Sequence, residues 1–242
     1  MSWFEELGFD ENPFDTSPEY SAKSSAGLQK PLADIEYFIS SGSMVFVEGP
    51  PGSGKSVLLA KLSGMLGGRA VRVDASQGEI DLRSVVRSKT SFLGRIFGTG
   101  PKNLVLMVDN SSYLPAATLD LLKYYYDNNQ FGAVILAGPS IRTARLSASM
   151  LDRIGNRIVR LEPLSEDDAV LIVRQRLGSS EVLSDDLVRK IYKLSGKNAK
   201  RFLQMCENAC KAAVASKSST VNEEHLQSLH PSLKNAVGGL DG

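Results

Sequence analysis

Short apolar runs alternate with helical stretches through the middle of this chain. The runs are mostly Val, Ile, Leu, Met and Ala, and they occupy residues 44–47, 70–73, 104–108, 133–137 and 157–161. Continuous apolar runs of this length are typical of strands buried on both faces of a parallel sheet, although the second and fifth each contain an Arg. Helical stretches such as 56–66 and 117–128 separate several runs. The alternation predicts an α/β fold with a parallel sheet.

The pattern before the first apolar run is different. Residues 1–24 are expected to be an irregular lead-in, with Pro13 and Pro18 among them. A helix is expected to follow, up to about residue 40, and Pro31 indicates that it either begins there or is kinked there. Its apolar stripe has helical spacing and consists of Leu28, Leu32, Ile35 and Phe38.

No strand pattern follows residue 161. Ser165 precedes a run of acidic residues, which is a helix-start signal. Helices are predicted at 167–177, 184–194, 198–215 and 222–229.

The predicted organisation therefore has four parts. Residues 1–43 form a lead-in and a helix that pack on the base, and residues 44–162 form the α/β base. Residues 163–230 form a small helical domain, and residues 231–242 form a loose tail with Pro231.

Composition excludes few classes of function. The chain has 242 residues, of which 42% are hydrophobic and 23% are charged, and its net charge is 28 − 27 = +1, so any basic surface must be local. The two cysteines, Cys206 and Cys210, lack the further ligands of a metal site. The N-terminus does not resemble a signal peptide, and the apolar runs are too short to cross a membrane. We therefore expect a cytoplasmic protein with no membrane partner.

One motif carries most of the chemistry. The segment Gly49, Pro50, Pro51, Gly52, Ser53, Gly54, Lys55, Ser56 fits the phosphate-binding pattern G-x-x-x-x-G-K-[ST] without a mismatch, and Val57 follows it. A predicted strand precedes the motif and a predicted helix follows it. Backbone N–H groups of such a loop surround phosphates, and a helix N-terminus adds positive potential. The motif predicts a site for ATP with Mg²⁺.

Individual residues of this site have predicted roles. Lys55 should reach the β- and γ-phosphates, and the Ser56 hydroxyl should ligate Mg²⁺. Asp109 ends the apolar run 104–108 and is the expected second residue of the magnesium shell.

Asn110 is the residue after that Asp. ATPases of this type usually have a Glu there, which polarises the attacking water. An amide is a poor proton acceptor, so general-base assistance worth ~10²–10⁴ in rate is missing unless another group supplies it. We predict nucleotide binding with slow hydrolysis.

The order of these features resembles an AAA+ ATPase, in the branch that holds general-secretion-type ATPases, transposition-regulator ATPases and origin-recognition initiators. The resemblance covers nearly the whole chain, and beyond the phosphate-binding loop it includes the segments 9–14, 134–138, 151–164 and 195–201. It implies a P-loop AAA+ base with a parallel sheet, followed by a small all-helical lid domain.

The resemblance also implies roles for further residues. Arg153 and Arg157 match the segment that supplies an arginine finger to a neighbouring subunit, and which of them acts is left open. The family's lid arginine falls on Lys200, with Arg201 one residue further on. The polar sensor after the fourth strand falls near Pro139, which has no donor. These departures favour a nucleotide-gated assembly factor over a fast motor.

A basic stretch lies between the second and third predicted strands. It contains Arg83, Arg87, Lys89, Arg95 and Lys102 and no acidic residue. DNA contacts and a solvated helix face are both consistent with this pattern.

Three functions remain open. The first is an ATP-binding AAA+ protein that self-associates into a ring, spiral or filament and acts on DNA. The second is a cytosolic ATPase that acts on a protein partner. The third is a small-molecule kinase, which is less consistent with the helical lid.

Overall fold

The computed structural model describes residues 2–78, 80–89 and 103–227. The chain divides into two compact units. One unit is Leu28–Glu162, and the other combines Met1–Gly27 with Pro163–Gly242. The division differs from the sequence expectation, which placed all of residues 1–43 on the base. The physical reason is that aromatic residues of the lead-in, such as Trp3 and Phe14, pack into the helical unit.

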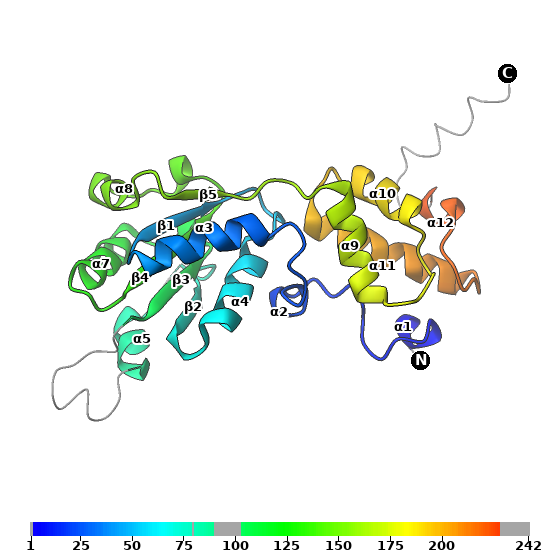
Figure 1. Cartoon of the computed structure of the whole chain (residues 1–242), viewed down its shortest axis with the longest axis horizontal. Helices are drawn as coiled ribbons and strands as arrows, with labels where there is room; N and C mark the ends of the chain where they lie inside the picture. The colour runs from blue at the N-terminus through cyan, green and yellow to red at the C-terminus, as the bar shows by residue number, and fades with distance from the viewer. Residues whose placement is uncertain (1, 79, 90–102, 228–242) are drawn as a thin grey trace, which may run out of the picture. The chain divides into compact units, whose positions relative to one another are not determined.

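The unit Leu28–Glu162 is built on a five-stranded sheet, as the apolar runs predicted (Figure 1). The strands lie in the order β2-β3-β4-β1-β5, and every neighbouring pair is parallel. They are β1 (Met44–Glu48), β2 (Ala70–Asp74), β3 (Val105–Asp109), β4 (Ala133–Gly138) and β5 (Ile158–Arg160). The two strands that contain an Arg are the edge strands, where Arg72 and Arg160 are exposed.

Helices cover both faces of this sheet. They are α3 (Gln29–Ser40), α4 (Lys55–Leu66), α5 (Leu82–Lys89), α7 (Ala116–Asp127) and α8 (Ala148–Ile154). Alternate strand residues point to opposite faces, so Val45 and Val47 pack with α3 and α4 in one core. Met44 and Phe46 belong to the other core, with residues of α5, α7 and α8. The result is a three-layer α/β unit.

Short elements complete this unit. The 3-10 helices are η1 (Gly67–Arg69), η2 (Ser111–Tyr113) and η3 (Ile141–Thr143). Helix α3 begins two residues before Pro31, which therefore lies in the first turn, where proline costs no intrahelical hydrogen bond.

The second unit is helical. Its elements are α1 (Trp3–Glu6), α2 (Pro18–Ser21), α9 (Glu166–Leu177), α10 (Asp185–Leu194), α11 (Ala199–Ala215) and α12 (Glu223–Gln227). Ser165 caps α9 as predicted: its hydroxyl accepts a hydrogen bond from the Asp168 backbone N–H over 3.0 Å. The lead-in is irregular as expected, except for the two four-residue helices α1 and α2.

Arg176 ties the lead-in to α9. Its guanidinium donates to the backbone carbonyls of Pro13 and Asp15, each over 2.9 Å, and to the Ser21 hydroxyl over 2.9 Å. It also lies over the Tyr20 ring. Phe14, which is fully buried, completes the core from the same segment.

None of the described helices is both long and apolar enough to span a bilayer. The predicted tail, residues 231–242, lies outside the described residues.

Candidate nucleotide site

The phosphate-binding loop connects β1 to α4, as predicted. Gly52 and Gly54 have φ angles of 79° and 99°, a region that glycine adopts without the penalty other residues incur. A Cβ on Gly49 would lie 2.6 Å from the Ser53 hydroxyl oxygen and 3.3 Å from Leu161 Cβ. The loop can therefore keep this tight backbone curve only with glycine at these positions.

Lys55 begins α4 and folds back over the loop. Its ammonium donates to the carbonyl oxygens of Gly49 over 2.6 Å and of Pro50 over 2.9 Å. Burial lowers the pKa of Lys55, and the charge of Asp109 opposes that shift. A partly desolvated ammonium at a helix N-terminus fits the triphosphate of a nucleotide.

Asp109 ends β3 and is buried. One of its carboxylate oxygens, Oδ1, accepts a hydrogen bond from the Asn110 N–H over 2.9 Å. Ser56 lies in the first turn of α4, after Lys55. No group of three or more His, Cys, Asp or Glu side chains that could hold a metal ion occurs among the described residues. Mg²⁺ in nucleotide sites is held by one or two protein oxygens together with phosphates and water, so Ser56 and Asp109 fit that pattern.

Asn110 has an unexpected partner. Its side-chain amide donates to Asp74 Oδ1 over 2.8 Å, and its backbone is left-handed, with φ 55° and ψ 34°. That hydrogen bond, together with bonds from Ser76, holds the pKa of the Asp74 carboxyl below its ordinary value. Asp74 and Asp109 are partners in the β2–β3 register, each at the end of its strand. Sequence reasoning missed Asp74, although the Asp at the end of the run 70–73 was a visible signal.

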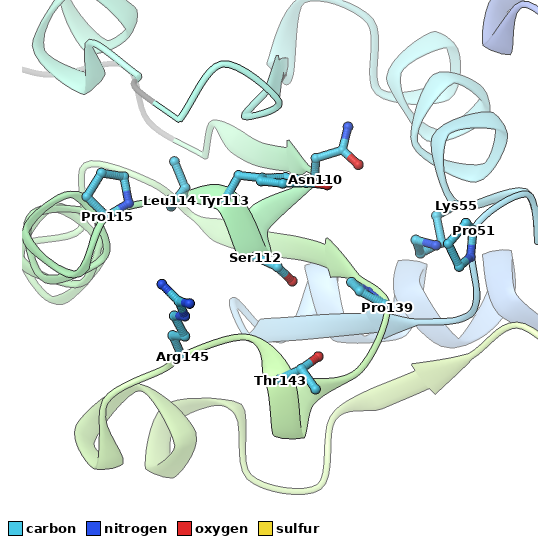
Figure 2. A pocket seen from close by; sticks show the side chains of 10 residues that line it. All are labelled: Pro51, Lys55, Asn110, Ser112, Tyr113, Leu114, Pro115, Pro139, Thr143 and Arg145. Atoms are coloured by element: carbon cyan, nitrogen blue, oxygen red, sulfur yellow. The ribbon is translucent and has the colours of Figure 1, made fainter.

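A pocket lies at the carboxyl ends of the strands (Figure 2). Its volume is about 750 Å³, and its lining residues are Pro51, Lys55, Asn110, Ser112, Tyr113, Leu114, Pro115, Pro139, Thr143 and Arg145. In open parallel sheets, this edge is where ligands bind. The pocket places Lys55, Asn110 and Pro139 around one space. Sequence reasoning did not identify Ser112, Thr143 or Arg145 as part of it.

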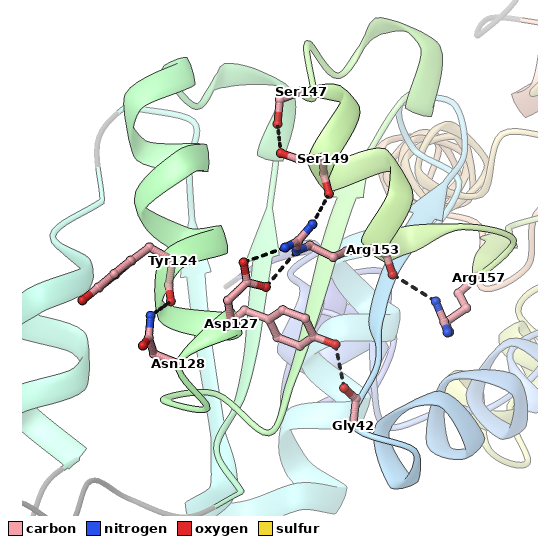
Figure 3. A network of polar contacts seen from close by, with 9 residues as sticks. Gly42, Tyr124, Asp127, Asn128, Ser147, Ser149, Arg153 and Arg157 are labelled. Atoms are coloured by element: carbon pink, nitrogen blue, oxygen red, sulfur yellow. Dashed lines mark hydrogen bonds and ion pairs between the residues drawn. The ribbon is translucent and has the colours of Figure 1, made fainter.

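Arg153 is held by groups of its own unit (Figure 3). Its guanidinium makes a two-pronged ion pair with Asp127, over 2.7 and 2.8 Å, and donates to the Ser149 carbonyl over 2.9 Å. Arg157 donates through Nη1 to the carbonyls of Arg153 and Ile154, at the end of α8. Arg153 is therefore the more firmly held of the two candidates for an arginine finger.

The candidate lid residues lie at the start of α11. Lys200 and Arg201 are both exposed, and the Arg201 backbone N–H donates to the Asn198 side chain over 3.0 Å. Their role at the nucleotide remains a prediction.

The candidate DNA residues are described only in part. Arg83 is exposed on α5, and Arg87 and Lys89 belong to the same helix. Arg95 and Lys102 lie outside the described residues.

Comparison with known proteins gives a structural match only. No protein-family model and no curated protein matches the sequence. Cdc6p from Pyrobaculum aerophilum is similar in structure, with a TM-score of 0.74 and 17% identity over 90% of this chain and 69% of that chain. RuvB from Thermotoga maritima, a Holliday junction branch migration motor, has a TM-score of 0.64 and 18% identity over 83% of this chain and 66% of that chain.

The third comparison is Drosophila ORC bound to DNA. Its TM-score is 0.62, with 16% identity over 90% of this chain and 65% of that chain. Identities this low show a shared fold. With the phosphate-binding loop, the Asp-ended β3 and the parallel sheet in place, this chain has the fold expected of an AAA+ ATPase and is similar in structure to Cdc6p and ORC.

Proposed function

We propose that this chain is an ATP-binding AAA+ protein that assembles on DNA under the control of its nucleotide and hydrolyses ATP slowly. The observation that carries the proposal is the Lys55 ammonium, which lies over a glycine-built loop within the field of the buried Asp109. A small-molecule kinase is less consistent with the helical unit that follows the α/β base.

Binding would exchange the partners of Lys55. Its ammonium leaves the carbonyls of Gly49 and Pro50 and binds the β- and γ-phosphates instead. Ser56 and Asp109 would hold Mg²⁺, which neutralises charge on the phosphate oxygens. The backbone N–H groups of the loop and the N-terminus of α4 bind the remaining phosphate oxygens.

Slow hydrolysis follows from Asn110. An amide that donates to Asp74 orients that carboxylate, and it cannot accept a proton from water. Asp74 is engaged in turn by Asn110 and Ser76, so it is a poor replacement for the base.

Assembly requires contacts between subunits, and we favour Arg157 over Arg153 as the residue that acts on a neighbouring subunit's nucleotide. Arg153 would first have to break its pair with Asp127, whereas Arg157 bonds to backbone carbonyls through a single nitrogen in the described structure. The expected product is a ring, spiral or filament.

DNA is the partner that we favour. Arg83, Arg87 and Lys89 bring positive charge to α5, with no acidic residue between them. Two of the structures similar to this chain are described as a branch migration motor and as a complex bound to DNA. A protein partner is the alternative that the experiments below separate.

Calorimetry with Mg·ATP tests the nucleotide site. We expect saturable binding to the unaltered protein and at least tenfold weaker binding to Lys55→Ala, which loses a charge-assisted bond to phosphate. Lys30→Ala is the matched control, because Lys30 is an exposed lysine of α3 that belongs neither to the loop nor to the lining of the pocket. If no heat is detected for the unaltered protein, the proposed function is wrong.

Filter binding to duplex DNA tests the partner. The logarithm of the affinity should fall steeply with the logarithm of salt, and Arg83→Ala with Arg87→Ala should flatten the slope by roughly 0.9 for each DNA phosphate that is no longer neutralised. Lys30→Ala should leave the slope unchanged. An absent or salt-independent signal would favour a protein partner. Sedimentation with and without ATP and DNA would then report whether assembly depends on either ligand.

A further inference from the structure

The pocket has a positive charge at each end. Lys55 and Pro51 lie at one side of the pocket in Figure 2, and Arg145 lies at the opposite side, with its guanidinium pointing toward Leu114 and Pro115. None of the lining residues is acidic. A volume of about 750 Å³ exceeds what one terminal phosphate needs beside Lys55. The Arg145 end is therefore a separate place for an anion.

Arg145 is held in an uncommon conformation. It follows η3 with a φ of 50°, which is unfavourable for a side chain with a Cβ. Its guanidinium is exposed, and no ion pair or hydrogen bond engages it within the described part of the chain. By contrast, the guanidinium groups of Arg153 and Arg157 bond to protein acceptors. The fold thus presents Arg145 to the pocket and tolerates backbone strain in doing so.

Hydroxyl groups accompany this arginine. The Ser112 hydroxyl is buried and has no hydrogen-bond partner among the described residues. A Cβ on Gly138 would lie 2.9 Å from the Ser112 hydroxyl oxygen, so glycine at that position leaves this hydroxyl its space. Thr143 lines the same pocket, and its hydroxyl donates to the Ser140 carbonyl over 3.1 Å. A buried hydroxyl without a partner is destabilising unless a ligand or a water molecule forms a hydrogen bond with it.

We propose that Arg145 and Ser112 form a second phosphate site, which holds the inorganic phosphate released from ATP before it leaves the protein. The inference rests on the proposed function, since hydrolysis must supply the ligand: water takes the γ-phosphoryl group and gives ADP, phosphate and a proton. A guanidinium binds a phosphate through two parallel N–H donors, and the Ser112 hydroxyl, which is buried beside Gly138 in this structure, adds a third only after its side chain turns into the pocket. The shared pocket gives the ion a continuous route from Lys55 to Arg145.

This site also bears on the rate of the cycle. Phosphate that stays at Arg145 remains inside the pocket that the γ-phosphate occupied. Its departure, and not the cleavage step alone, would then set how long the product state lasts. Slow release of phosphate would therefore prolong the assembled state.

Equilibrium dialysis of radiolabelled inorganic phosphate against the full chain, saturated with Mg·ADP, tests the proposal. We expect saturable binding that weakens about tenfold to a hundredfold in Arg145→Asn, since bonds to a charged group are lost. Asn is the chosen replacement because it tolerates the left-handed backbone of this position. Ser112→Ala should weaken binding by a smaller factor. Arg142→Ala is the control, because Arg142 is an exposed residue of η3 that does not line the pocket.

The outcomes separate the two proposals. If Mg·ADP binds and phosphate does not, or if Arg142→Ala weakens phosphate binding as much as Arg145→Asn, the second phosphate site does not exist. If neither ADP nor ATP binds, the proposed function itself fails. If a DNA oligonucleotide displaces the phosphate, and Arg145→Asn weakens DNA binding equally, the residue is a nucleic-acid contact and the inference is overturned.

Discussion

The replacement Asn110→Glu tests the reason given for slow hydrolysis. The substitution supplies a carboxylate where the chain now has an amide 2.8 Å from Asp74 Oδ1. It also places a residue less tolerant of φ 55° at that position, at a cost of about 1–2 kcal/mol. The new carboxylate has Asp74 as its neighbour, so its ionisation is opposed.

The repulsion between the new carboxylate and Asp74 can be estimated. Two unit charges 4 Å apart repel by about 1 kcal/mol in bulk water and by about 4 kcal/mol near a protein surface. Asp74 is exposed, so we take about 1–2 kcal/mol, which raises the pKa of the glutamate by about one unit. It is then still ionised at pH 8. The gain from a general base, ~10²–10⁴, therefore outweighs the repulsion.

Single-turnover hydrolysis of ATP, measured from pH 5 to pH 8, is the assay. Asn110→Glu should raise turnover at pH 8 at least tenfold. In the double variant Asp74→Ala with Asn110→Glu, the acid limb of the pH–rate profile should shift to lower pH by about one unit, because the neighbouring negative charge is gone. Asp74→Ala alone supplies no base and should stay slow.

Two results would refute this reasoning. One is rapid turnover by the unaltered protein, which would mean that Asn110 does not limit hydrolysis. The other is an acid limb at the same pH with and without the Asp74 carboxylate, which would mean that the two side chains do not interact.

Three further predictions follow from other contacts. Arg176→Met should lower the free energy of unfolding by about 2–4 kcal/mol in urea titrations, because partly buried acceptors lose a charged donor. Arg174→Met is the control, since it breaks a more exposed ion pair on the same helix. An effect of Arg176→Met no larger than that of the control would contradict the prediction. Burial raises the pKa of Cys210 from 9.0 to about 12. Between those pH values the unfolded chain releases a proton that the folded chain keeps, so the free energy of unfolding falls as pH rises. Cys210→Ala should make the free energy of unfolding depend less on pH, and an unchanged dependence would contradict the prediction. The double variant Arg153→Ala with Asp127→Ala should lower the melting temperature by less than the sum of the two single effects. The difference should shrink at about 1 M salt, because salt screens the ion pair. Additive effects would show that the ion pair is not stabilising.

The sequence predicted the parts of the fold that depend on local pattern. Short apolar runs predicted the strands, and the spacing of Gly52, Gly54 and Lys55 predicted the phosphate-binding loop with its flanking strand and helix. Even the two Arg-bearing runs proved to be strands, and they lie at the sheet edges where an exposed side chain is tolerated.

The interactions that decide the chemistry were not predictable in this way. Asn110 and Asp74 are 36 residues apart, and they meet only because β2 and β3 pair in one particular register. The same holds for Arg153, whose acceptor Asp127 lies 26 residues earlier. Arg145 could not be found either, since a single exposed arginine has no periodicity and the left-handed turn that aims it has no sequence signature outside Gly, Asn and Asp.

The path of the chain makes the α/β unit an insertion within the helical one. Asn12 donates to Glu207 across 195 positions, and Phe14 fills a core whose other members begin with Ala169. During synthesis the aromatic side chains of this segment therefore stay unburied until the helices α9 to α11 have left the ribosome. A fragment that starts at Pro163 would lack Trp3 and Phe14, and we expect it to aggregate unless the missing peptide is added back.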